Sequence, residues 1–202
     1  MSENKQAAPA PNNGSGGSGG GGMTGDQLMN TAKAKYTITL LIFVCGLMLL
    51  FFIISTAIPQ LKSGSTTVTF WRVKSRILGT SFSSPISDVN CSPLKTRMQA
   101  GGAFSILGIF ALIGALVTLI LEFLDKMPVP HVGAALTAFA WFSSMICWTV
   151  VAGVYNETHC GGRWGNGGKY GPGFGLMVFN WIFLLAALVI YVLRFLKILP
   201  DL

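Results

Sequence analysis

Four long stretches of the chain carry no charged side chain, and this feature constrains the fold more than any other. They cover residues 36–61, 98–121, 127–156 and 170–193. An α-helix rises about 1.5 Å per residue, so about 20 apolar residues match the roughly 30 Å hydrocarbon core of a bilayer. We therefore predict an all-α membrane protein with a four-helix transmembrane bundle, its spans at residues 36–58, 99–121, 132–154 and 174–196.

A soluble helical bundle is the alternative, and it would need a polar stripe along each helix. The stretches Leu40–Ile54 and Ile106–Leu121 are instead apolar or small on every face. Only 10% of the residues are charged, whereas soluble domains average about 25%. Composition therefore favours the membrane protein.

The remaining segments form tails and loops of different character. Residues 1–35 are rich in small and polar residues and predict a disordered tail, because they offer little apolar surface to bury. Residues 59–98 make the largest loop, where Thr66–Val73 is strand-like because Thr, Val, Phe and Trp favour extended structure. The other connections are a short turn at residues 122–131, a glycine-rich, irregular loop at 155–173, and a second tail at 197–202.

An even number of spans places both termini on one side of the membrane and the loops at 59–98 and 155–173 together on the other. Basic residues do not decide which side is cytosolic, because six lie with the termini and eight in the two loops. Asn90-Cys91-Ser92 and Asn156-Glu157-Thr158 fit the N-glycosylation pattern, and both lie in these loops. We therefore expect cytosolic termini, in the plasma membrane or another membrane of the secretory pathway.

The four cysteines divide by location. Cys45 and Cys147 fall inside predicted spans, where a small packing residue is the ordinary role. Cys91 and Cys160 lie in the two loops that share a compartment, so a disulfide between them is predicted. Free thiols or a metal site are the alternatives, but the chain has only two histidines, and a zinc site therefore lacks ligands.

Charged groups are placed in a way that disfavours several functions. No Asp, Glu, Lys or Arg lies deep in a predicted span, which argues against a proton relay or a charged ion path. No nucleophile, acid–base pair or metal-ligand set converges on one loop, so we expect neither an enzyme nor a cofactor. The net charge of +7 comes from scattered residues, which favours contact with membrane lipids and disfavours nucleic acid as a partner.

Residues 36–198 resemble amastin, a family of surface glycoproteins whose architecture is related to that of claudins. The matching pieces are Thr69-Phe70-Trp71 with Lys74, Cys91, Val150–Asn156, Cys160, and Tyr170-Gly171-Pro172-Gly173-Phe174. The family signature has a cysteine on each side of its tryptophan core and a glycine after the tryptophan. Thr67, Ile77 and Arg72 occupy those positions here, so the chain resembles a divergent branch that lacks the local loop disulfide.

The resemblance implies a left-handed four-helix bundle with a small extracellular β-sheet, built from the first loop and capped by the third, and cytosolic termini. We expect a structural, adhesion or membrane-organising protein that contacts a surface protein, glycan or lipid through Trp71, Arg72, Lys74 and Arg76, or forms a homo-oligomer. Trp71 is the weakest of these candidates, because such a tryptophan also pins the loop to the sheet core or the bilayer. The alternative function is a lipid-binding protein or an auxiliary of a transporter or channel.

Overall fold

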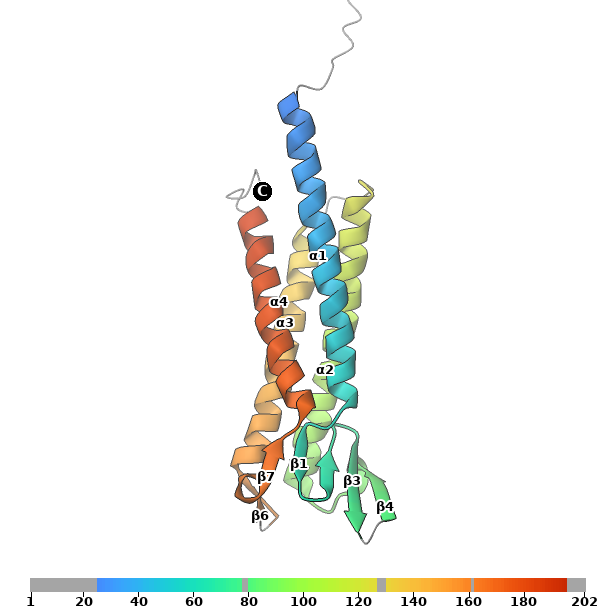
Figure 1. The fold of residues 1–202 in the computed structure, drawn as a ribbon, viewed down its shortest axis with the longest axis vertical. Coiled ribbons are helices and arrows are strands. Elements are labelled where there is room, and N and C mark those ends of the chain that lie inside the picture. The colour runs from blue at the N-terminus through green and yellow to red at the C-terminus, as the bar shows by residue number, and fades with distance from the viewer. Residues whose placement is uncertain (1–24, 78–79, 127–129, 161, 196–202) are drawn as a thin grey trace, which may run out of the picture.

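The computed structural model describes residues 25–77, 80–126, 130–160 and 162–195. In this part of the chain four long helices run side by side (Figure 1): α1 (Gly25–Ala57), α2 (Ser92–Phe123), α3 (Pro130–Asn156) and α4 (Pro172–Phe195). Each is long and apolar enough to cross a membrane, over Lys35–Ala57, Ser92–Phe123, His131–Asn156 and Pro172–Leu193. The predicted four-helix architecture is confirmed.

The helices turn most of their apolar surface outward. Only 28–33% of the most apolar window of each helix is buried. Large side chains such as Phe43 and Phe110 are exposed to 68% and 66% of their area. A water-soluble protein rarely exposes such wide apolar surfaces, whereas a bilayer covers them.

Small residues allow the helices to approach closely at the centre of the bundle. Gly108 of α2 lies against the Phe52 ring of α1 and against Ser143 of α3, and a Cβ atom at Gly108 would overlap that ring. Ala111 and Ala115, one and two turns further along α2, are buried as well. Helices in membranes associate through this kind of contact, because apolar burial adds little where the solvent is lipid.

An antiparallel sheet lies at one end of the bundle, opposite the end at which α4 finishes (Figure 1). Its strands among the described residues are β1 (Leu61–Ser63), β2 (Thr66–Val68), β3 (Arg72–Ile77), β4 (Thr80–Pro85) and β7 (Gly168–Tyr170), in the order β4-β3-β2-β1-β7. The first four come from the connection between α1 and α2. A short ribbon of β5 (Thr158–His159) and β6 (Gly162–Arg163) follows α3.

The predicted strand-like run Thr66–Val73 is two strands in the structure, with a turn between them. The Thr69 hydroxyl accepts hydrogen bonds from the backbone N–H groups of Trp71 and Arg72, at 3.3 and 2.9 Å. The Thr69 N–H in turn donates to the Arg72 carbonyl at 2.9 Å. A threonine that bonds its own backbone favours a turn over an extended strand, and the chain therefore reverses here.

All four helices begin earlier in the chain than the predicted spans, α3 and α4 by two residues and α1 and α2 by more. α2 begins at Ser92, with a proline in its first turn and Cys91 as the residue before it. Proline suits this position because its missing N–H would have no partner in the helix. α1 begins at Gly25, inside the segment predicted as a disordered tail, while residues 1–24 and 197–202 lie outside the described residues.

Candidate functional site

Lysines and small hydroxyl residues form a straight row across all the strands of the sheet. Strand pairing sets Ser83 opposite Lys74, Lys74 opposite Thr67, Thr67 opposite Lys62, and Lys62 opposite Lys169. Directly paired residues of an antiparallel sheet share one face. The row therefore brings the loop between α3 and α4 next to the loop between α1 and α2.

Alternation along β3 adds two arginines to the same face. Arg72 and Arg76 are two residues before and after Lys74, and successive strand residues point to opposite faces. Val73, which lies between Arg72 and Lys74, points to the other face, where it is partly buried and packs against the hydrophobic core. We call the exposed cations Lys62, Arg72, Lys74, Arg76 and Lys169 the basic face.

A hollow of about 340 Å³ opens on the basic face. Its lining includes Lys62, Lys74 and Arg76, and the hydroxyl groups of Ser65, Thr67 and Ser81. The hollow lies beside the turn at Gly64 and Ser65, where β1 and β2 connect, and towards the end of β3. Gly64 has a φ of 52°, which the tight turn between two antiparallel strands requires.

Among the described residues, no acidic side chain forms an ion pair with a cation of the basic face. The ion pairs in this part of the chain join Lys35 to Asp125, in the opposite half of the molecule, and Arg97 to Glu157. None of the five cations of the basic face takes part in either pair. Like charges on neighbouring strands repel one another, so this surface favours a bound anion.

The Thr69-Phe70-Trp71 turn anchors the sheet to the bundle. Phe70 is fully buried against Gly101 of α2, and a Cβ atom at Gly101 would lie 2.6 Å from its ring. The Trp71 ring lies over Gly102, the next residue. Trp71 thus packs on α2, while 42% of its surface stays exposed beside Arg72.

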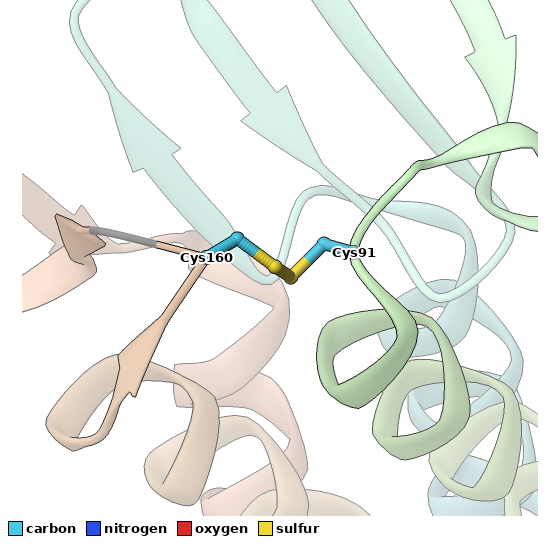
Figure 2. Close-up of a disulfide and its surroundings, with 2 residues drawn as sticks. All are labelled: Cys91 and Cys160. Carbon is cyan, nitrogen blue, oxygen red and sulfur yellow. A yellow bond between two sulfur atoms is a disulfide. The ribbon is translucent and has the colours of Figure 1, made fainter.

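Cys91 and Cys160 form a disulfide, as predicted, with their Cα atoms 5.9 Å apart. Figure 2 shows the bond crossing from the start of α2 to the residue that follows β5. Cys91 is buried and Cys160 is exposed. The bond closes a large loop that contains α2 and α3, and it fixes the sheet end of these helices.

An ion pair strengthens the same junction. The Arg97 guanidinium of α2 lies 2.6 Å from the Glu157 carboxylate, which directly follows α3. The hydrogen bond from Arg97, together with its charge, lowers the pKa of Glu157 below its ordinary value of 4.5. Glu157 is therefore ionised at neutral pH and holds the ends of α2 and α3 together.

Close backbone contacts and stacked rings position β7 and, with it, Lys169. The Gly171 N–H donates to the Gln60 carbonyl at 2.7 Å, and Gly171 lies so close to the Pro59 carbonyl that a Cβ atom has no room. The Tyr170 ring stacks between Tyr155 and Phe174, with centroids 4.1 Å apart in each pair. These contacts hold β7 at the open edge of β1.

The remaining predicted residues lie apart from the basic face. Asn90 and Asn156 are exposed, as a glycan acceptor must be, and the Asn156 amide donates to the Ala152 carbonyl at 3.0 Å. Cys45 and Cys147 are buried free thiols inside the bundle. The described residues include no group of three or more His, Cys, Asp or Glu side chains that could hold a metal ion.

The sequence did not indicate that Lys62, Thr67 and Lys169 lie next to Lys74 and Arg76, which were predicted as partner-contact residues. The local signal for Lys62 and Thr67 was the Gly64-Ser65 pair, which is typical of a two-residue hairpin turn. Lys169 had no such signal, because β7 pairs with a strand from a distant loop. Its place on the basic face depends on tertiary structure.

Comparison with known proteins gives one family match. The model of the family described as amastin surface glycoprotein matches residues 34–191. This range contains the whole sheet, all of α2 and α3, and most of α1 and α4. No curated protein matches the chain. The matched region contains the basic face and the disulfide.

Proposed function

The chain belongs to the amastin surface glycoprotein family, and on that premise we propose that this multi-pass membrane surface protein contacts a partner outside the cell through its basic face. The role is one of adhesion or membrane organisation and involves no catalysis. In this proposal the contact residues are Lys62, Arg72, Lys74, Arg76 and Lys169. Trp71 is left out of the contact, because its ring packs on Gly102.

The observation that carries this proposal is the grouping of five exposed cations on one side of a small sheet. They come from β1, β3 and β7, and among the described residues none is in an ion pair. Repulsion between paired Lys62 and Lys169 disfavours the fold slightly. A binding role explains why the chain keeps an arrangement that folding alone does not favour.

The proposed orientation places the sheet outside and both termini in the cytosol. The Cys91–Cys160 disulfide and the candidate glycan acceptors Asn90 and Asn156 all lie at the sheet end of the bundle. Disulfides persist in oxidising compartments, and N-glycans are added in the lumen of the secretory pathway. Both features support an external sheet.

The packing of the bundle supports a structural role rather than conduction of ions or polar solutes. Phe52 fills the space beside Gly108 at the centre of the helices. Charged side chains are absent from the middle of all four apolar stretches. A conducting path for ions or polar solutes ordinarily leaves such groups in the spans.

A cell-binding assay tests the proposal. The full chain, reconstituted in neutral lipid nanodiscs on fluorescent beads, is expected to bind intact cells, and Lys74→Gln with Arg76→Gln is expected to lose most of that binding. Lys126→Gln is the matched control, because it removes an exposed positive charge between α2 and α3 at the other end of the molecule. Equal binding by all three proteins would overturn the proposal.

A further inference from the structure

We infer that the hollow on the basic face binds an anionic saccharide, meaning a hydroxyl-rich sugar that carries sulfate or phosphate groups. The inference rests on the proposed contact role of this face and adds the chemical class of the ligand. Four features of the hollow support this inference: the number of its cations, the polarity of the rest of its lining, its distance from the bundle, and its volume.

The cations surround the hollow on more than one side. Lys62 lines it from β1, while Lys74 and Arg76 line it from β3. Sulfate and phosphate groups present several oxygens, and an arginine can donate two parallel hydrogen bonds to one such group while each lysine adds a charge. A ligand with more than one anionic group satisfies this arrangement better than a single carboxylate does.

The rest of the lining consists of small polar residues. Ser65, Thr67 and Ser81 contribute hydroxyl groups, and the described lining contains no aromatic or branched aliphatic side chain. A hydroxyl both donates and accepts hydrogen bonds, which matches the hydroxyls of a sugar. Protein partners are instead usually anchored by aromatic and apolar side chains, for which this hollow offers no surface.

The position of the hollow disfavours lipid headgroups of the protein's own membrane. β1 leaves the bundle after α1 and turns at Gly64 and Ser65, and β3 begins directly after Trp71, which packs on α2. Figure 1 shows β3 running away from the helices. At about 3.3 Å per strand residue, Arg76 lies roughly 13 Å along β3 from Arg72. The hollow is thus at the end of the sheet that points away from the helices.

The volume also suits such a ligand. About 340 Å³ is near the lower end of the range of roughly 300–1,000 Å³ that is typical of small-ligand sites. A sugar unit with its substituents fits a site of that size, and Lys169 and Arg72, which flank the hollow on the same face, can contact neighbouring units of a longer chain.

The test uses the full chain in phosphatidylcholine nanodiscs and three defined probes: a heparin-derived hexasaccharide, the same hexasaccharide after chemical desulfation, and a phosphorylated oligomannose. We expect the first or third probe to bind, and the desulfated probe to bind at least about tenfold more weakly than its sulfated parent if sulfate is the group recognised. Which probe binds distinguishes sulfate from phosphate. Binding of the desulfated probe as tightly as of the other two would overturn the inference, as would binding of none.

Variants localise the binding. Lys62→Gln, Lys74→Gln and Arg76→Gln are each expected to weaken it about tenfold, because a hydrogen bond to a charged group is worth roughly that factor or more. Lys126→Gln is the control and should bind normally. Because all three side chains are exposed, the variants should unfold at no lower a temperature than the parent chain. A triple variant that is folded and still binds at full strength would overturn the inference.

The two proposals fail in distinguishable ways. If the basic-face variants lose cell binding while no anionic saccharide binds or competes, the saccharide inference is wrong and the contact role stands. If the saccharide binds but cell binding is unaffected by the variants, the contact role is wrong. Binding to phosphatidylserine vesicles without binding to either anionic saccharide would assign the hollow to membranes and overturn the inference.

Discussion

Lys62 and Lys169 are paired directly across β1 and β7, although they come from different loops of the chain. Because like charges on facing strand residues repel, Lys169→Glu should create a favourable pair in their place. We expect the thermal unfolding temperature to rise by an amount equivalent to about 0.2–1 kcal/mol, and binding through the basic face to weaken. Thermal unfolding in detergent measures the first effect. A lower unfolding temperature would show that Lys169 contributes to stability in a way that the pairing does not reveal.

Gly101 and Phe70 make the contact that seats the sheet on α2. Gly101→Ala places a methyl group 2.6 Å from the Phe70 ring, and such overpacking typically costs about 1–3 kcal/mol. We expect a lower unfolding temperature, partly restored by Phe70→Leu in the same chain. Gly175→Ala on α4 is the control, because nothing lies within 4 Å of its added carbon. Equal stability of the two single variants would contradict the close contact.

The Cys91–Cys160 bond is expected to stabilise the protein by about 2–4 kcal/mol, since it restricts the unfolded chain over a long loop. Replacement of both cysteines by serine should lower the unfolding temperature by a matching amount and make it insensitive to reducing agent. Intact mass should increase on reduction by the two hydrogens that one disulfide takes up. An unchanged mass after reduction would show that the bond does not form.

Acid should loosen the junction between α2 and α3. The pKa of Glu157 is lowered by Arg97, so the folded state binds fewer protons than the unfolded state as pH falls past 4.5. The stabilisation is therefore present above about pH 4.5 and is lost as pH falls through the lower pKa of the folded state. Unfolding temperatures of the parent chain and of Glu157→Gln, measured from pH 7 to pH 3, should converge at the acidic end. Parallel curves would contradict the assignment.

Orientation can be tested through Asn90, which is exposed at the sheet end of the molecule. An external sheet predicts that this residue carries an N-glycan, so that Asn90→Gln increases electrophoretic mobility and a glycosidase no longer changes it. Ser92→Ala is the control, because it removes the acceptor pattern without altering Asn90. Access of protease to the first 24 residues in sealed, inverted vesicles gives an independent readout. Protection of that segment in such vesicles would place the termini outside.

The helices could be predicted because each signal is contained in its own segment. The absence of charge from Tyr36 to Leu61 identifies a membrane-crossing helix whatever the rest of the chain does. The Cys91–Cys160 bond could be predicted for a related reason, since an even number of spans places both loops in one compartment. In both cases a rule about the membrane replaced knowledge of the tertiary structure.

Apart from the Gly64-Ser65 turn, the sheet depended on contacts that no local pattern reveals. β1, β2 and β7 have three residues each, too few for an alternating pattern to be recognised. The glycine-rich stretch that holds β7 looks irregular until Gly171 is seen against the Pro59 carbonyl, where no larger residue fits. Gly101 and Gly102 likewise resemble ordinary span residues, and only the rings of Phe70 and Trp71 explain them.

The pairing of β7 with β1 imposes an order of events on biosynthesis. Ribosomes deliver the chain from its N-terminus, so β1 to β4 reach their compartment while α3 and β7 are still unmade. Until β7 arrives, β1 presents an open strand edge that other chains can pair with. The sheet can therefore be completed only after the third and fourth helices have been made, whereas the Cys91–Cys160 bond can form as soon as β5 has followed α3.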